Sequence, residues 1–187
     1  MPVDFDALLA RPEVTERLSW TFDFRLETEP RAPYWFTVDG VSELQHLGRD
    51  SSGGEFVRLP DSTVLYASSE GEVGIIAADF NAFIQLIVTH PYWRDILKFS
   101  GGGELAEMRR AAIALEAVAL VDEDDLEEAR EFVKSQLGLD EPADAVGALH
   151  RAVSMSGMVA RAYGAPCVSL FNRFTIDDTP TLRGLVD

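Results

Sequence analysis

The side chains best suited to metal binding or covalent catalysis are few and lie far apart in the sequence. The three histidines are His46, His90 and His150, and the one cysteine is Cys167. A zinc site needs ligands at short, regular spacing. A covalent catalyst needs its nucleophile in a recognisable setting, such as the sharp turn that carries an esterase serine. Neither pattern is present, so we predict no catalytic residue, no metal site, no cofactor and no enzymatic activity.

Two glycine-rich segments have the composition of a phosphate cradle. Gly53-Gly54 leads into a predicted strand, and no Lys-Ser or Lys-Thr pair follows it. Gly101-Gly102-Gly103 does precede a predicted helix, whose N-terminal amides can meet an anion. Glu104 at that helix start opposes an anion, and a run of glycines favours neither helix nor strand. We therefore interpret residues 100–103 as a linker.

The acidic run from Asp122 to Asp125 is more typical of a helix start than of a calcium loop. It lacks the alternating oxygen ligands and the central glycine of an EF-hand. Asp122 can cap a helix that has Asp125 in its first turn, and Val121 can pack against Leu126 beside that cap. We therefore expect these carboxylates to stabilise the start of a helix.

An excess of acid is the strongest compositional signal. Thirty-two Asp and Glu residues against sixteen Lys and Arg give a formal net charge of −16. Such a field repels phosphate backbones and anionic lipid, so we predict that the chain binds neither nucleic acid nor membranes. It attracts basic surfaces and speeds encounter with them. Solubility alone also explains excess acid, and that alternative stays open.

A cytoplasmic location is expected. No apolar run approaches the roughly 18 to 20 residues of a membrane span. The N-terminal segment contains Asp4 and Asp6 and no basic residue before Leu9, unlike a secretory signal. The single cysteine cannot form an internal disulfide.

Residues 1–100 are predicted to form an α+β core. One or two short helices, with a break near Pro12, precede an alternating segment at 20–27. That alternation predicts a strand whose buried face carries Trp20, Phe22, Phe24 and Leu26. Turn signals then separate further β-rich runs at 34–38, 55–59, 63–67 and 73–77, of which the last three predict an antiparallel meander. Asp79 can cap a helix that ends near His90-Pro91.

Residues 101–187 are predicted to form a mostly helical extension packed on that core, unless the whole chain is one domain. A first helix covers 104–120. A second carries the apolar stripe Leu126, Ala129, Val133 and Leu137 and ends at Gly138. A third begins near Pro142 and passes Val153. The tail at 166–176 has strand-like content without a predicted partner.

The segment His90-Pro91-Tyr92-Trp93-Arg94 places two large aromatic residues beside a proline, a composition enriched at binding hot spots. Tyr92 and Trp93 are therefore candidate partner-binding residues. The alternative is that they lock the end of the preceding helix onto the sheet, since aromatic residues bury large areas in cores as readily as in interfaces.

The central segment resembles the SUKH superfamily, which includes yeast cell-wall assembly regulators and many bacterial immunity proteins. The motifs that carry the resemblance are Leu47-Gly48-Arg49-Asp50, Gly53-Gly54-Glu55-Phe56, Val64-Leu65-Tyr66, Ser69-Glu70-Gly71-Glu72 and Ile76-Ala77-Ala78-Asp79-Phe80 with Phe83 and Leu86. The resemblance covers roughly residues 34–99 and implies a strand meander with a glycine-containing hairpin and a closing helix.

The resemblance also implies binding of a protein partner. Many bacterial members neutralise a toxin, often a nuclease, and an acidic inhibitor suits a basic nuclease. We therefore predict a non-enzymatic immunity-type inhibitor, with Glu70, Glu72, Tyr92 and Trp93 as candidate contact residues. Two alternatives stay open: a regulatory or scaffolding module of the same fold that self-associates through its helices, and an enzyme or small-ligand binder with a pocket between sheet and helices.

Overall fold

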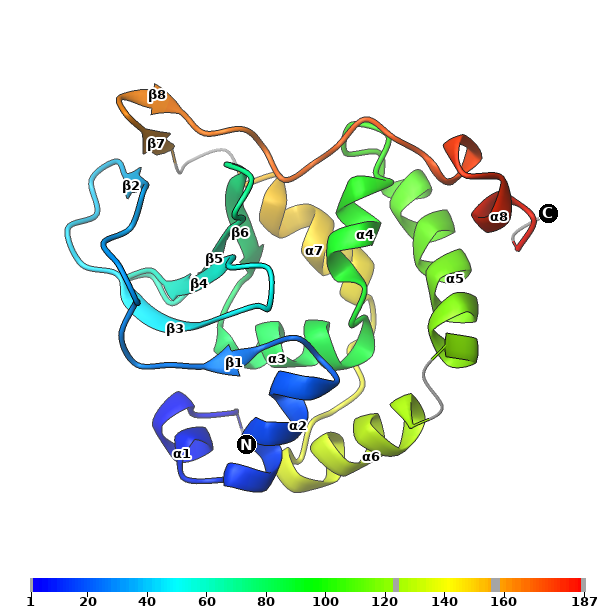
Figure 1. The fold of residues 1–187 in the computed structure, drawn as a ribbon, viewed down its shortest axis with the longest axis horizontal. Coiled ribbons are helices and arrows are strands. Elements are labelled where there is room, and N and C mark those ends of the chain that lie inside the picture. The colour runs from blue at the N-terminus through cyan, green and yellow to red at the C-terminus, as the bar shows by residue number, and fades with distance from the viewer. Residues whose placement is uncertain (1, 123–124, 156–158, 186–187) are drawn as a thin grey trace.

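A five-stranded antiparallel sheet lies at the centre of the fold (Figure 1). The computed structural model describes residues 2–122, 125–155 and 159–185. The strands follow the order β1 (Arg25–Leu26), β3 (Gln45–Arg49), β4 (Glu55–Arg58), β5 (Val64–Ala67) and β6 (Val73–Ala77). Helices cover one face, which confirms the predicted α+β class and the antiparallel meander of β4, β5 and β6.

Both faces of the sheet are buried, because its strands alternate between two apolar clusters. Phe56 and Tyr66 point into the larger cluster, which the helices cover. Their neighbours Val57 and Leu65 point into the smaller cluster on the opposite face. This double burial explains why β5 and β6 are apolar runs without an exposed side.

A second, three-stranded sheet covers the smaller cluster. It consists of β2 (Thr37–Val38), β7 (Ala160–Ala162) and β8 (Ala165–Pro166), with β7 in the middle. Val38 and Ala160 from this sheet are buried against the face that carries Val57. The β-rich run predicted at 34–38 thus pairs with a strand far along the chain, not with the meander.

The N-terminal helices confirm one prediction and correct another. Helices α1 (Phe5–Leu9) and α2 (Pro12–Trp20) are separated before Pro12, as expected. The strand predicted from Trp20 onward is wrong, because α2 continues through Trp20 and the indole is 79% exposed. Only Arg25–Leu26 pairs as β1, although Phe22 and Phe24 are buried.

Helix α3 (Phe80–Thr89) follows the meander as predicted, and the short helix α4 (Trp93–Lys98) comes after it. The Asp79 carboxylate accepts a hydrogen bond from the amide of Ala82 at 2.7 Å and so caps α3. Phe83 and Ile84 on the apolar face of α3 are fully buried against the sheet.

Three longer helices complete the larger cluster: α5 (Leu105–Asp122), α6 (Leu126–Leu137) and α7 (Ala145–Val153). Gly138 ends α6 in a left-handed conformation, as predicted. The predicted start of α6 is wrong by one turn. Asp122 belongs to α5 by its backbone, Asp125 lies at the N-cap of α6, and Val121 is 77% exposed and does not pack beside the cap. The rest of that acidic run, 123–124, lies outside the described residues.

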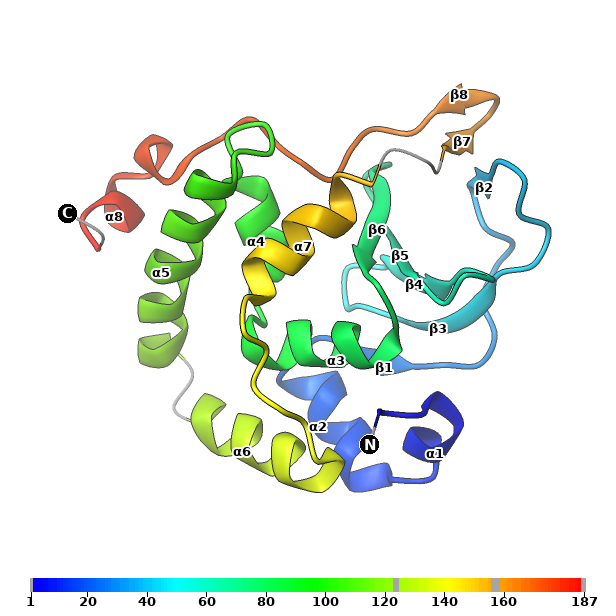
Figure 2. The same ribbon diagram turned by 180° about the vertical axis from the view of Figure 1, so that it is seen from behind.

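The glycine segment after α4 connects the two predicted parts, but it is a fixed turn. The amides of Gly101 and Gly102 donate to the carbonyls of Phe174 and Asn172, each at 2.8 Å, and the buried Ser100 hydroxyl also donates to Asn172. All three glycines have a positive φ. Figures 1 and 2 show the tail passing this turn on its way from β8 to the 3-10 turn Ile176–Asp178 and α8 (Pro180–Arg183).

The predicted division of the chain into two parts at residue 100 stays a prediction, but one apolar cluster includes residues from both parts. The larger cluster contains Phe83 from the first part together with Met108, Leu126 and Leu149 from the second. Within the described ranges, no helix is long and apolar enough to cross a bilayer.

Arg130 on α6 joins three helices through a nearly buried guanidinium group. Its side chain is 7% exposed and donates to the carbonyls of Val88 and Thr89 at the end of α3. It also forms a two-pronged ion pair with Glu116 of α5, at 2.7 and 2.8 Å, and pairs with Glu127 at 2.6 Å. All five N–H groups therefore have acceptors, two of which are carbonyls that the helix end leaves open.

We expect Arg130→Met to lower the free energy of unfolding by about 3 kcal/mol, because it leaves Glu116 without its cation and two helix-end carbonyls without the guanidinium donor. Urea denaturation measures this loss. The matched control is Arg109→Met, since Arg109 is 55% exposed and pairs with Asp144 at the surface; its cost is expected to stay below about 1 kcal/mol. Equal losses in the two variants would contradict the assigned role of Arg130.

A buried histidine lies under the segment that leads into β2. His46 is 4% exposed, and its Nδ1 is hydrogen-bonded to the Tyr34 hydroxyl at 3.1 Å. Its Nε2 has no hydrogen-bond partner within the described part of the chain. Burial is the main cause that lowers the pKa of His46, and Arg49 lowers it further while Glu27 opposes the shift.

His46 makes folding sensitive to acid. Because its pKa is lower in the folded state than the ordinary value of 6.5, the unfolded state binds more protons, and stability is lost as the pH falls below that value. We expect His46→Asn to weaken this loss, by up to about 1.4 kcal/mol per pH unit. Denaturation of both proteins at pH 7.5, 6.5 and 5.5 isolates His46, because all other groups titrate in both. Parallel curves would refute the assignment.

Candidate functional site

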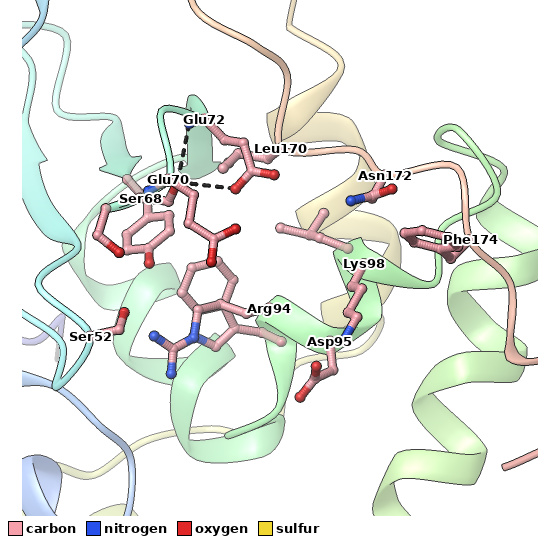
Figure 3. A pocket seen from close by; sticks show the side chains of 14 residues that line it. Ser52, Ser68, Glu70, Glu72, Arg94, Asp95, Lys98, Leu170, Asn172 and Phe174 are labelled. Atoms are coloured by element: carbon pink, nitrogen blue, oxygen red, sulfur yellow. Dashed lines mark hydrogen bonds between the residues drawn. The ribbon is translucent and has the colours of Figure 1, made fainter. Parts of the chain in front are cut away.

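An open hollow of about 560 Å3 lies where the β5–β6 turn, helix α4 and the C-terminal tail meet (Figure 3). Trp93 and Leu170 contribute apolar surface to it. Its polar side chains include those of the turn (Ser68, Glu70, Glu72), of α4 (Arg94, Asp95, Lys98), of the tail (Asn172) and of the β3–β4 hairpin (Ser52). The hollow thus depends on segments that are distant in the sequence.

The β5–β6 turn is held in shape by Ser68. Its hydroxyl accepts hydrogen bonds from the amides of Glu70 and Glu72, at 3.2 and 3.1 Å, and donates to the Glu72 carboxylate at 3.0 Å (Figure 3). Gly71 has a φ of +99°, a conformation that residues with a side chain rarely adopt. The turn therefore presents the exposed Glu70 side chain from a defined backbone.

A hydrogen-bond network centred on Asp50 lies beside the hollow. One carboxylate oxygen accepts from the amide and hydroxyl of Ser52, at 2.9 and 2.8 Å, and from the amide of Gly54 at 2.8 Å. The other accepts from the Tyr66 hydroxyl at 2.6 Å and from Arg94, which also pairs with Asp23. Asp50 is 2% exposed, so this buried charge is fully satisfied and ties α4 to the sheet.

Burial and the neighbouring groups of this network shift the pKa of both Tyr66 and Arg94. Burial, and then the hydrogen bond to Asp50, raise the pKa of Tyr66. The phenol therefore keeps its proton and donates a hydrogen bond to Asp50. Burial alone lowers the pKa of Arg94, but Asp50, Tyr66 and Asp23 together outweigh that effect, so the pKa is raised. Arg94 is therefore committed to the fold and is not a free cation of the hollow.

The carboxylates at the rim of the hollow are not neutralised in this way. Glu70, Glu72 and Asp95 form no ion pair with a basic residue in the ranges that the structure describes. Lys98 is exposed and lies 5.4 Å from the centre of the Phe99 ring. Because Asp23 and Asp50 already neutralise Arg94, the rim carries a local excess of negative charge that is open to solvent.

The structure brings together three of the four candidate contact residues. Glu70, Glu72 and Trp93 line the same hollow. Trp93 is only 3% exposed and packs edge-on against Tyr66, with the two ring centres 5.0 Å apart. Most of its ring therefore holds α4 to the sheet. Tyr92 lies elsewhere, with its hydroxyl bonded to Glu116 and 3.1 Å from His90 Nδ1.

A second hollow, of about 380 Å3, lies on the other side of the β5–β6 turn. Glu70 borders both hollows, and the second is lined by Trp35, Tyr163 and Val168. Tyr163 is 99% exposed and Val168 is 66% exposed. Sequence reasoning missed these residues, because neither an isolated tyrosine nor a lone valine forms a pattern. The one local signal was Gly164 after Tyr163, a weak form of the two-residue hairpin turn.

Groups of the kind that bind metals are dispersed in the structure. Among the described residues, no three or more His, Cys, Asp and Glu side chains are placed to hold a metal ion. His46 bonds to Tyr34, His90 to Tyr92, and His150 Nε2 to the Gly103 carbonyl at 2.8 Å. That the chain works without a metal or cofactor stays a prediction.

Comparison with known proteins identified no relative. No protein-family model matches the chain, and neither a curated protein nor a solved structure matches it. The SUKH resemblance therefore stays a prediction from the sequence motifs.

We expect Asp50→Asn to lower the free energy of unfolding by about 3 kcal/mol, because it removes the charge that Arg94 faces in a buried site. The matched control is Asp61→Asn. Asp61 forms a similar turn in the β4–β5 loop, where it accepts from the amide and hydroxyl of Thr63, but it is exposed. That control is expected to cost less than about 1 kcal/mol. Chemical denaturation compares the two, and a control that costs as much as Asp50→Asn would show that the charge is not the cause.

Proposed function

We propose that the chain is a protein-binding module that neutralises a basic protein, as an immunity-type inhibitor of a nuclease toxin. The observation that carries the proposal is the acid of Glu70, Glu72 and Asp95, which outnumber Lys98 at the rim of an open hollow and form no ion pair within the described ranges. Carboxylates placed at a nuclease active surface compete for the positions that phosphates take. In this proposal the β5–β6 turn is the centre of the contact.

The different pairing of the acidic residues supports this choice of surface. Asp50 and Glu116 are acidic residues whose partners are arginines of the same chain, so they serve the fold. Ser68 and Arg94 line the hollow, but the Ser68 hydroxyl is used by the turn and Arg94 by two carboxylates. The rim carboxylates are the lining groups left to pair with an incoming cation.

The resemblance to the SUKH superfamily points to the same surface. The motif Ser69-Glu70-Gly71-Glu72 is part of the turn that separates the two hollows. A toxin-neutralising member of that superfamily acts by binding, and electrostatic attraction by a net charge of −16 accelerates encounter with a basic target.

A regulatory or scaffolding role for the same fold is the alternative, but its proposed contact surface is already occupied. Leu126, Ala129 and Val133 on the apolar stripe of α6 are each 0% exposed and pack inside the monomer. Self-association therefore requires another surface, and substitution of Val133 by a charged residue is expected to unfold the chain rather than dissolve a dimer.

The test uses the basic nuclease or toxin-like protein encoded beside the gene. We expect the chain to bind that protein and to abolish its nuclease activity at equimolar concentration. The double variant Glu70→Lys/Glu72→Lys is expected to lower the association rate constant at least tenfold at low salt, because it reverses the charge of the rim. Surface plasmon resonance at two salt concentrations measures the effect.

The matched control is Glu16→Lys/Glu43→Lys, which changes the net charge equally at two exposed positions away from the hollow. It is expected to slow association by less than threefold. If no protein encoded beside the gene is bound or inhibited, the proposed function is wrong. If both double variants slow association equally, the field of the whole chain acts and the rim has no special part.

A further inference from the structure

The β7–β8 hairpin carries an aromatic residue at a position that disfavours one. Ala162 pairs with Ala165, so Tyr163 and Gly164 form a two-residue turn. Both have positive φ values, +50° and +84°. Such a turn favours Asn or Gly at its first position, and a tyrosine there is strained. Its side chain is 99% exposed and gains no packing in return.

A strained backbone that holds an exposed aromatic side chain is typical of a contact site. Tyr163 borders the second hollow, whose other walls include the half-buried ring of Trp35 and the exposed carboxylate of Glu70. Cys167 and Val168 complete its apolar lining. Two aromatic residues and a carboxylate thus border an open space of about 380 Å3.

The edge of the small sheet favours side-chain binding over addition of a strand. β8 is an edge strand, and its second residue is Pro166, which has no N–H group to donate. A partner strand would meet a short edge with a missing donor. A partner side chain, in contrast, meets the open hollow beside it.

We propose that this second hollow is the receptor for one arginine side chain of the basic partner. A guanidinium group is planar and stacks on aromatic rings, here those of Tyr163 and Trp35. It also pairs with a carboxylate through two parallel hydrogen bonds, here that of Glu70. Glu70 connects the two hollows, so an arginine held in the second one places the rest of the partner against the acidic rim. This inference rests on the proposed function, because it names the group by which the partner is recognised.

The first test uses a peptide probe and the full chain, and does not need the partner. Acetyl-Gly-Ser-Arg-Ser-Gly-amide is titrated into isotope-labelled protein, and the indole N–H of Trp35 and the amides of 162–165, 167–168 and 69–71 are followed by NMR. We expect saturable shifts centred on these groups. The same peptide with citrulline, which keeps the shape of arginine and loses its charge, is expected to bind at least fivefold more weakly.

Two variants separate the hollow from the general field of an acidic protein. Tyr163→Asn removes the ring and relieves the turn, so the variant is expected to fold at least as well as the parent and to bind the arginine peptide at least fivefold more weakly. Trp20→Ala removes another exposed aromatic residue, which borders a different acidic hollow with Glu13 and Glu16. It is expected to leave the affinity unchanged.

The outcomes distinguish this inference from the proposed function. If the peptide shifts spread evenly over the surface, if citrulline binds as well as arginine, or if only Trp20→Ala weakens binding, the receptor is not this hollow. If the toxin-like protein is bound and inhibited with the same affinity by Tyr163→Asn, the inference fails and the proposed function stands. If the arginine peptide binds as expected but no protein encoded beside the gene is bound, the receptor stands and the proposed function fails.

Discussion

The buried carboxylate of Asp50 is the interaction on which the rest of the site depends. A single unsatisfied charge in such a position costs several kcal/mol, so the chain must supply donors for it from several directions. The hairpin supplies backbone amides, β5 supplies the Tyr66 hydroxyl, and α4 supplies the guanidinium of Arg94. Helix α4 is thereby fixed against the sheet, and with it the wall of the larger hollow. The same arrangement neutralises Arg94, because its guanidinium group pairs with Asp50 and Asp23. The rim of the hollow therefore stays acidic.

Two uses of negative charge can therefore be told apart in one very acidic chain. Asp50 and Glu116 are paired with arginines and hold elements together, Asp50 in the sheet and α4, Glu116 among the helices. Glu70 and Glu72 lie on a turn whose shape is fixed by Ser68, and neither has a basic partner in the described ranges. Neither carboxylate gains the stabilisation of an ion pair from this placement. It is the arrangement expected where the cation comes from another molecule.

Local patterns predicted most of the secondary structure, and long-range contacts account for what they missed. The cap at Asp79 and the end of α6 at Gly138 depend on neighbouring residues, so both were predictable. The predicted position of Trp20 is wrong because the alternating apolar pattern of residues 20–27 begins on the last residue of helix α2. Neighbouring residues alone predict a linker at 100–103, because the carbonyls that fix this turn lie some seventy residues away in the sequence. The site was half predictable: Glu70 and Glu72 stand in a recognisable turn, whereas Tyr163 joins them only through the second sheet.

The central claim is that the surface around the β5–β6 turn meets a basic protein. Hydrogen–deuterium exchange of the free chain, and of the chain saturated with the basic toxin-like protein encoded beside its gene, tests this most directly. We expect the amides of residues 68–72, 160–165 and 167–168 to become protected in the complex, while those around Trp20 on α2 exchange as before. Protection confined to α2 and α6, with the turn unchanged, would contradict it.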